Sequence, residues 1–225
     1  MRVVSLVPSV TETLLAWGVT PVAVTRFCEH PELAHVGGTK DPDVAAIVTL
    51  APDLVVVNDE ENRKEDFDAL ERAGLAVHVV RIETVDDVAP AMEALAAAVG
   101  TSVAGPALAA RRPSRLRAFV PIWRRPWMTM NAQTYGSSVL AHLGVTNAFA
   151  DAPSRYPTVT LDDVARERVD VVLAPTEPYP FSSRHEAELA TVAPVTFVDG
   201  QDLFWWGART PGALERLDAQ LALLG

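Results

Sequence analysis

Residues 52–57 have the sequence Pro-Asp-Leu-Val-Val-Val, and residues 169–174 have the sequence Val-Asp-Val-Val-Leu-Ala. Each is a short apolar run of the kind that forms a strand buried on both faces of a parallel sheet. A polar loop, a helix and a second apolar run follow in both cases, the second run at 76–80 or at 195–198. The repeated pattern predicts an α/β chain made of two similar Rossmann-like lobes with parallel sheets.

Strand and helix signals alternate along the remainder of the chain. Short apolar runs predict further strands at 2–7, 22–25 and 116–122. Helical patterns predict helices at 10–17, 42–49, 64–73, 86–99, 137–143, 161–168, 184–190 and 211–224.

Polar residues at several helix starts can satisfy the first free backbone amides of the helix. A glutamate, Glu12 or Glu186, stands three residues after a serine at two of these starts, which is the spacing of a capping box. Another start has an aspartate directly before a proline, the residue favoured at the first helical position. The expected N-cap residues are Ser9, Asp41, Thr160 and Ser183.

A connector separates the two predicted lobes. We expect an N-terminal lobe at 1–84, a connecting helical hinge at 85–114 and a C-terminal lobe at 115–225. Residues 86–112 are mostly Ala, Val, Leu and Glu, and they contain no flexible Gly/Ser-rich run. The connector is therefore expected to be a stiff, shortened backbone helix.

Composition restricts the class of protein. The chain has 225 residues, 49% of them hydrophobic, a formal net charge of −10 and a single cysteine. Such a chain is neither disordered nor a disulfide-stapled miniprotein. Its acidity argues against nucleic-acid partners, since these bind clustered Lys and Arg. No apolar run is long enough for a membrane span and no leader is recognisable, so we expect a cytoplasmic location. The alternative is a periplasmic or cell-surface location after removal of a leader.

Candidate ligand-binding residues cluster at the carboxyl ends of the predicted strands, where open α/β sheets bind ligands. Large aromatic residues are frequent in these loops in the second half of the chain. Rings at loop tips either line a cleft for a large flat ligand or pack between the lobes. The predicted ligand-binding residues are Pro8, Ser9, Arg26, Phe27, Cys28, Asn58, Glu60, Trp123, Trp127, Tyr156, Glu177, Tyr179, Phe181, Trp205 and Trp206.

Signals for metal binding and catalysis are weak. Cys28 and His30 lie two residues apart, but a closed metal site needs a third and a fourth ligand. His30 is therefore expected at most to contact a metal carried by a ligand. The common phosphate-loop, dinucleotide, hydrolase and metalloprotease motifs are missing. An enzyme remains the alternative, with Cys28, His30 or Glu177 as acid, base or nucleophile.

Several stretches resemble the class III substrate-binding proteins of ABC transporters, and in particular the cobalamin-binding branch of vitamin B12 import. The resemblance extends over nearly the whole chain and includes the superfamily motifs S-L-x-P-S-x-T-E and A-P-D-L-V. It rests on residues 4–12, 24–31, 37–40, 50–55, 156–157, 170–173 and 202–211.

The resemblance implies two lobes joined by a backbone helix, with the ligand in a cleft between them and no intrinsic cofactor. It implies that Phe27 and Trp205 take the places of aromatic residues against a corrin ring. Asn58 stands where characterised cobalamin binders have a tryptophan, and Lys64 where an acidic permease-docking residue is expected. We therefore expect a binding protein for a cobalamin-like corrinoid or another metal chelate, such as haem or a siderophore. The protein is expected to act either as a transport component, with an ABC permease as its partner, or as a cytoplasmic carrier.

Overall fold

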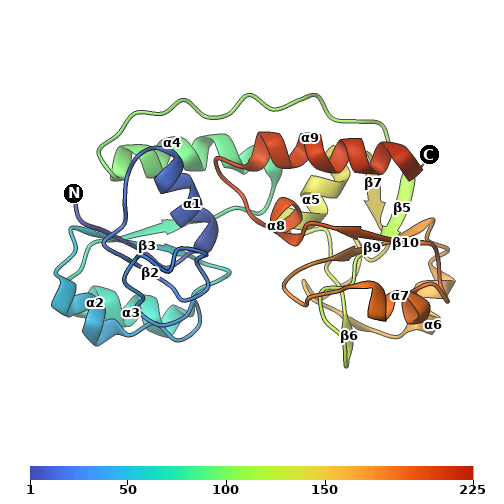
Figure 1. The fold of residues 1–225 in the computed structure, drawn as a ribbon, viewed down its shortest axis with the longest axis horizontal. Helices are drawn as coiled ribbons and strands as arrows, with labels where there is room; N and C mark the ends of the chain where they lie inside the picture. The colour runs from blue at the N-terminus through green and yellow to red at the C-terminus, as the bar shows by residue number, and fades with distance from the viewer. Residues whose placement is uncertain (225) are drawn as a thin grey trace. The chain divides into compact units, whose positions relative to one another are not determined.

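The computed structural model describes residues 1–224, which form two compact units. Unit 1 comprises residues 1–82, 87–106 and 206–208 (Figure 1). Unit 2 comprises residues 83–86, 107–205 and the chain from Arg209 onward. Among the described residues, no helix is both long enough and apolar enough to cross a membrane.

Unit 1 contains a four-stranded parallel sheet. Its strand order is β2-β1-β3-β4. The strands are β1 (Val3–Ser5), β2 (Ala23–Val24), β3 (Leu54–Asn58) and β4 (Val77–Val80). The helices are α1 (Pro8–Ala16), α2 (Val44–Leu50), α3 (Lys64–Arg72) and α4 (Val88–Ala98).

Unit 2 contains a second four-stranded parallel sheet, with strand order β10-β9-β5-β7. Its strands are β5 (Leu116–Phe119), β7 (Val145–Asn147), β9 (Val171–Pro175) and β10 (Val195–Val198). A separate antiparallel pair consists of β6 (Trp127–Met128) and β8 (Thr158–Val159). The helices are α5 (Tyr135–His142), α6 (Leu161–Arg166), α7 (Glu186–Leu189), α8 (Gly200–Phe204) and α9 (Thr210–Leu221), with short 3₁₀ turns at Val85–Asp87, Ser183–His185 and Ala222–Leu224.

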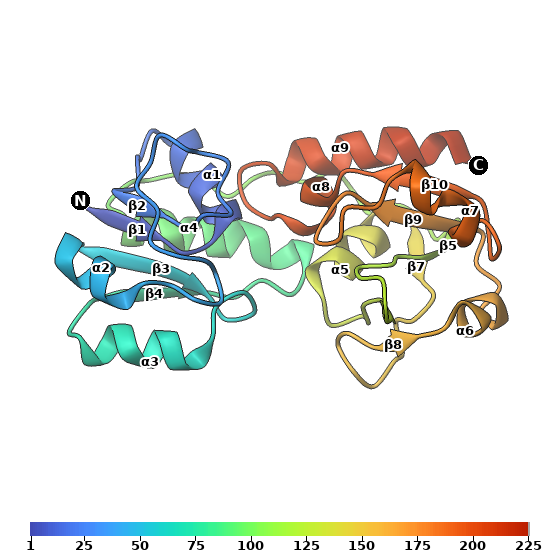
Figure 2. The same cartoon turned by 60° about the horizontal axis from the view of Figure 1, so that its bottom comes forward.

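The two main sheets have the same topology. In each, the second strand in chain order flanks the first, the third lies on the other side of the first, and the fourth flanks the third. Because parallel crossovers are right-handed, this change in the order of the strands places the helix after the first strand on one face of the sheet and the helices after the second and third strands on the other. Figure 2 shows this in unit 1, with α1 on one face of the sheet and α3 on the other. The predicted fold class, α/β with two similar parallel-sheet lobes, is confirmed.

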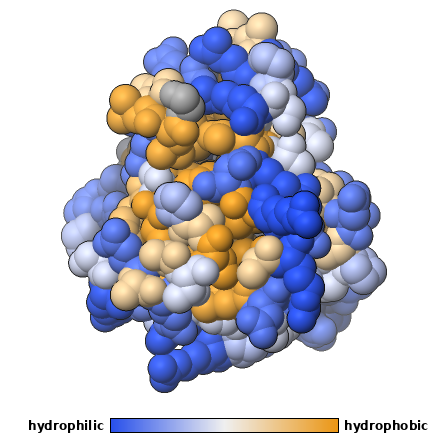
Figure 3. Space-filling view, turned by 90° about the vertical axis from the view of Figure 1, so that its right-hand side faces the viewer, coloured by the Kyte–Doolittle hydropathy of each residue, from blue (hydrophilic) through white to orange (hydrophobic). Residues whose placement is uncertain are grey.

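Each unit has an apolar core of its own. In unit 1 the side chains of β1 and β3 pack with Ile47 of α2 and Leu70 of α3. In unit 2 Phe119 and Val172 pack with Val164 of α6 and Leu189 of α7. On the face of unit 2 shown in Figure 3, apolar residues form a central area with hydrophilic residues along its margins. Burial of the core side chains beneath the surface is the main favourable contribution to folding in both units.

Two predicted helix starts in unit 1 are wrong. The N-cap of α1 is Val7, not Ser9, and no side chain caps this helix. Proline needs no amide partner at a first helical position, so Pro8 begins the helix and Ser9 lies inside it. At α2 the N-cap is Asp43, whose carboxylate accepts from the Ala46 amide 2.9 Å away. Asp41 instead forms an ion pair with Arg26.

The capping predictions in unit 2 give one confirmation and one correction. Thr160 and Asp163 form a reciprocal capping box at α6. At the other site the N-cap is Ser182, and His185 completes the box that was expected from Ser183 and Glu186. Four short elements were not predicted, namely β6, β7, β8 and α8.

The connector is helical only in its first half. Helix α4 ends at Ala98, and Gly100 follows with a positive φ of 75°. Residues 101–115 have no regular secondary structure. Glycine and proline at positions 105, 106 and 113 disfavour a helix in this segment. The helix predicted at 86–99 is present, whereas the expectation that the connector at 85–114 is helical as a whole is wrong for residues 101–114. The boundaries proposed for the lobes stay a prediction.

Candidate functional site

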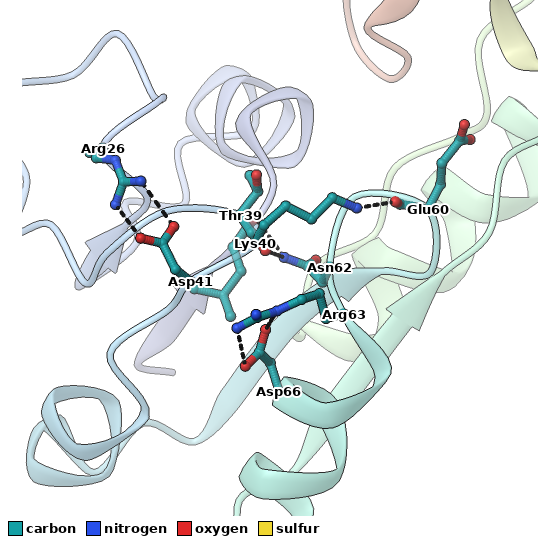
Figure 4. Close-up of polar contacts among 9 residues, drawn as sticks. Arg26, Thr39, Lys40, Asp41, Glu60, Asn62, Arg63 and Asp66 are labelled. Atoms are coloured by element: carbon teal, nitrogen blue, oxygen red, sulfur yellow. Dashed lines mark hydrogen bonds and ion pairs between the residues drawn. The ribbon is translucent and has the colours of Figure 1, made fainter. Parts of the chain in front are cut away.

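In unit 1, Asn62 joins three loops at the carboxyl ends of the strands (Figure 4). Its amide nitrogen donates to the carbonyl of Leu6 at 3.2 Å and to that of Thr39 at 2.9 Å. Its amide oxygen accepts from the backbone N–H of Asn58 at 2.8 Å. Asn62 is buried, so these bonds are protected from water and fix the loops that follow β1, β2 and β3.

Asn58, predicted to contact a ligand, is engaged with the backbone in the same way. Its side-chain oxygen accepts from the amides of Glu60 and Glu61, at 2.9 and 3.1 Å. Its side-chain nitrogen donates to the carbonyl of Val80 at 3.2 Å. The residue is only 3% exposed, and its amide shapes the loop after β3.

The loop that joins β2 to α2 presents an aromatic ring and two cationic side chains. Phe27 is 54% exposed, and the guanidinium of Arg26 lies 5.0 Å from the centre of its ring. Two hydrogen bonds, of 3.0 and 2.9 Å, hold Arg26 to Asp41. The Lys40 ammonium donates to the carbonyl of Glu60 at 2.6 Å (Figure 4). This edge of unit 1 therefore combines an exposed ring with charged groups.

Three other predicted contact residues of unit 1 are buried. Pro8 and Ser9 lie in the first turn of α1, and the Ser9 hydroxyl is buried without a hydrogen-bond partner. Cys28 is 6% exposed, with its sulfur 3.3 Å from the Thr11 hydroxyl and 3.5 Å from that of Thr25.

His30 lies on the same loop as Phe27. Its ring nitrogen Nδ1 is 2.9 Å from the carboxylate of Glu32. Hydrogen bonds from the backbone of Glu32 itself and from His30 lower the pKa of Glu32. Across residues 1–224, no group of three or more His, Cys, Asp or Glu side chains could hold a metal ion.

In unit 2 the rings of Trp123, Trp127, Tyr179, Phe181 and His185 form one group, called here the aromatic cluster. Phe181 lies at its centre, stacked on Trp127 at 6.0 Å and tilted against Tyr179 at 4.7 Å. Trp123 meets Tyr179 edge-to-face at 5.5 Å. Phe181 is 3% exposed, whereas Trp123 is 46% exposed. The cluster is therefore a ring stack with a buried base and one exposed member.

Polar groups surround the aromatic cluster. The guanidinium of Arg124 lies 5.8 Å from the ring centre of Trp127 and pairs with the carboxylate of Glu188 at 2.7 Å. The hydrogen bond with Glu188 raises the pKa of Arg124. Burial, followed by the charges of Arg184 and Arg124, lowers the pKa of His185. His185 is therefore neutral near pH 7 and serves as an aromatic packing element.

The remaining predicted residues differ in exposure. Tyr156 is 38% exposed, whereas Trp206 is 3% exposed and belongs to unit 1. Trp205 is half-buried in unit 2, under the guanidinium of Arg209 at 5.2 Å. That guanidinium is 3.2 Å from the carboxylate of Asp202, which is buried. Glu60 and Glu177 are half-buried and engaged in other contacts.

The predicted residues thus differ in accessibility. Phe27, Trp123 and Tyr156 are exposed, whereas Phe181, Trp206 and Cys28 are packed inside. Half-buried members of the set are Glu60, Trp127, Glu177, Tyr179 and Trp205. Sequence reasoning overlooked Lys40, Asn62, His185 and Asp202, whose side chains contact the loops or rings of the predicted site. Lys40 and Asn62 bond to residues 20 or more positions away, and no local spacing signals such contacts.

Two units of this topology, with loops at the carboxyl ends of their parallel sheets, are typical of α/β ligand-binding proteins. The chain matches the family described as periplasmic binding protein over residues 3–190 and belongs to that family. The resemblance to class III substrate-binding proteins of ABC transporters is confirmed.

Several known proteins are similar to this chain. A vitamin B12-binding protein of Vibrio cholerae is 26% identical over 215 residues, covering 85% of this chain and 77% of that protein. The vitamin B12-binding protein of Salmonella typhimurium is 27% identical over 198 residues, covering 77% and 72%.

Solved structures share the fold. The periplasmic vitamin B12-binding protein of Vibrio cholerae superposes with a TM-score of 0.77 at 21% identity, covering 99% of this chain and 97% of that one. A periplasmic haem-binding protein in complex with two haems superposes with a TM-score of 0.80 at 21% identity, covering 99% and 98%.

These relatives bear on the alternatives that the sequence left open. They are substrate-binding proteins, so a binding protein is supported and the enzyme alternative is not. The expected cytoplasmic location is not supported, whereas the periplasmic alternative is consistent with the family.

Proposed function

We propose that the chain binds a flat metal chelate non-covalently, and that a cobalamin-like corrinoid is the first candidate. The observation that carries the proposal is Trp123, a large ring left 46% exposed although it packs against Tyr179, which packs in turn against Phe181. A ring held in this way loses little side-chain freedom when a ligand covers it. The names of the curated relatives favour a corrinoid as that ligand.

The exposed rings account for affinity in physical terms. Covering roughly 100 Å² of one aromatic side chain contributes about 2.5 kcal/mol from the removal of apolar surface from water. We propose Phe27 in unit 1, and Trp123 and Tyr156 in unit 2, as the direct contacts. Phe181 packs against Tyr179, the ring that contacts Trp123, and Trp127 stacks on Phe181.

Polar groups beside the rings would recognise the rim of the ligand. Arg26 and Lys40 lie on loops next to Phe27 and carry positive charge. Such groups hydrogen-bond to amides, carboxylates or phosphates. For Asn58 we propose an indirect role, since its amide already bonds to Glu60, Glu61 and Val80.

Haem is the second candidate ligand. The structure with a TM-score of 0.80 is a haem-binding protein in complex with two haems. Corrinoids and haem share a flat metal-bearing macrocycle, and aromatic faces suit both. The two ligands differ in their rims, which carry amides in cobinamide and carboxylates in haem.

A binding panel tests the proposal. Purified protein is dialysed to equilibrium against cyanocobalamin, dicyanocobinamide, haemin or a ferric siderophore, and bound ligand is quantified by visible absorbance. We expect one macrocycle to bind and Trp123→Ala to weaken its binding at least tenfold. Val48→Ala, which also truncates an exposed apolar side chain, serves as the matched control and should bind like the wild type. Failure of all four chelates to bind would refute the proposal.

We further propose that the protein works outside the cytoplasm and delivers its ligand to an ABC permease. Membership of the periplasmic binding protein family supports both statements. Fractionation of the native host, followed by immunodetection, tests the location. Recovery of the protein only with the cytoplasmic fraction would contradict it.

A further inference from the structure

A pocket of about 330 Å³ lies in unit 1 between the first turns of α3 and the carboxyl ends of β3 and β4. Its volume falls within the range of small-molecule sites in proteins, about 300–1,000 Å³. The pocket contains none of the exposed aromatic residues proposed to contact the chelate. Its lining comprises Val57, Asn58, Asp59, Asn62, Arg63, Lys64, Phe67, Val79 and Arg81.

One wall of the pocket is apolar. Val57 of β3 and Val79 of β4 are paired in register, so their side chains lie on the same face of the sheet. Phe67 of α3 packs against the unit 1 core, which includes Val57. Val79 is nevertheless 36% exposed. The core between α3 and the sheet is thus open to solvent at this end.

The sequence of α3 explains the opening. The helix begins with Lys64, Glu65 and Asp66, and Phe67 is its first apolar residue. Asn58 and Asn62 hold the backbone of the loop between β3 and α3 through hydrogen bonds. The side-chain amides of Asn58 and Asn62 are occupied by these hydrogen bonds. The charged residues of the rim are therefore the groups that can recognise a polar part of a ligand.

Cations outnumber carboxylates in the lining of the pocket. The lining includes Arg63, Lys64 and Arg81 but one carboxylate, that of Asp59. Their ion pairs with Asp66, Asp68 and Asp59 involve largely exposed cations. Exposed pairs contribute little to stability, so the cations can turn toward an incoming anion at low cost. Hydrogen bonding to Asp66 and Asp68 raises the pKa of Arg63 and of Lys64, and both stay charged at physiological pH.

We propose that this pocket is a second binding site, separate from the chelate-binding surface, for a small amphipathic anion. Its ligand has an aromatic or short aliphatic body against Val57, Phe67 and Val79, and a carboxylate, phosphate or sulfonate within reach of Lys64 and Arg81. The proposal goes beyond chelate binding and does not depend on it.

Calorimetric titration with phenyl phosphate tests the site. Phenyl phosphate supplies both required features, whereas inorganic phosphate lacks the apolar body and benzyl alcohol lacks the charge. We expect phenyl phosphate to bind at one site per chain, at least tenfold more tightly than either of the other two. No measurable binding at millimolar concentration, or equal binding of inorganic phosphate, would overturn the proposal.

Variants then locate the binding. The double variant Lys64→Gln/Arg81→Gln should weaken phenyl phosphate binding at least tenfold, and Val79→Asp should abolish it. Arg72→Gln removes a cation from the same helix but outside the pocket lining, and should leave binding unchanged. Circular dichroism checks that each variant is folded.

A further variant separates this site from the chelate surface. Trp123→Ala should bind phenyl phosphate as the wild type does. Loss of binding in Trp123→Ala, or full binding in the folded double variant, would contradict the assignment to this pocket. Phenyl phosphate is not a chelate, so a failure of phenyl phosphate to bind would not bear on the chelate proposal. A failure of the chelates to bind would likewise not bear on the proposal for this pocket.

Discussion

At the scale of single residues, Asn62 shows how one side chain organises an edge of a sheet. It satisfies two carbonyls and one amide that belong to three separate loops. A buried backbone group that loses its partner costs about 1–3 kcal/mol. The arrangement of the loops after β1, β2 and β3 therefore depends strongly on this amide.

We predict that Asn62→Leu lowers the free energy of unfolding by about 2–4 kcal/mol, since it leaves several buried groups unpaired. Chemical denaturation monitored by circular dichroism measures the change. Gln133→Ala, which removes an amide from an exposed position, is the control and should change stability little. Equal stability of Asn62→Leu and the wild type would show that the loops are held in another way.

His185 gives the stability of the protein a dependence on pH. Burial and the nearby charges of Arg184 and Arg124 outweigh Glu188 and lower its pKa below the ordinary value of 6.5. The unfolded chain therefore takes up a proton at a higher pH than the folded chain does. The stability gained from neutral His185 is complete above about pH 6.5 and is lost as the pH falls below that value.

We predict that the stability difference between the wild type and His185→Gln shrinks when the pH falls from 7.5 to 5.5. Denaturation of both proteins at the two pH values provides the measurement. Burial also lowers the pKa of His78, but this effect is common to both chains and cancels in the comparison. A difference that grows at pH 5.5 would contradict the environment assigned to His185.

At the scale of elements, the helix starts show which sequence signals act locally and which are overridden by neighbouring residues. Thr160 is the N-cap of α6 as expected, and it forms a capping box with Asp163 because all partners lie within one turn. Ser9 has similar spacing to Glu12, yet Pro8 begins that helix and the serine hydroxyl is left buried without a partner. A capping motif identifies a helix start only where no neighbouring residue provides a better one.

Two substitutions test this distinction. Thr160→Ala should destabilise the protein by about 1 kcal/mol, since it removes the side chain that accepts from the third amide of α6. Ser183→Ala should have little effect, because the N-cap at that site is Ser182. Thermal unfolding of the two variants under identical conditions gives the comparison. A larger loss from Ser183→Ala than from Thr160→Ala would reverse our assignment.

The main strands and helices were predictable because apolar runs such as Val55 to Val57 have few alternatives to a buried strand. The very short β6 and β8 were not, since two-residue strands depend on a partner distant in sequence. For the site, sequence patterns pointed to aromatic residues in loops. They could not tell exposed Trp123 from buried Trp206, because exposure depends on tertiary packing.

At the scale of the whole molecule, the chain repeats one strand order in two units. The repeated order explains why both halves of the sequence show an apolar strand, a polar loop and a helix in succession. It also gives each unit a point at which the strand order reverses, beside which α/β proteins place their ligands. The surfaces at the carboxyl ends differ, with cations near one exposed ring in unit 1 and a supported ring cluster in unit 2.

The central claim is that these exposed rings bind a planar macrocycle, and a calorimetric titration of the wild type with cyanocobalamin and with haemin tests it most directly. We predict that one of the two binds with one-to-one stoichiometry, quenches tryptophan fluorescence and loses at least tenfold in affinity in Trp123→Ala. Absence of binding for both macrocycles, or an affinity that Trp123→Ala and Phe27→Ala leave unchanged, would contradict the claim.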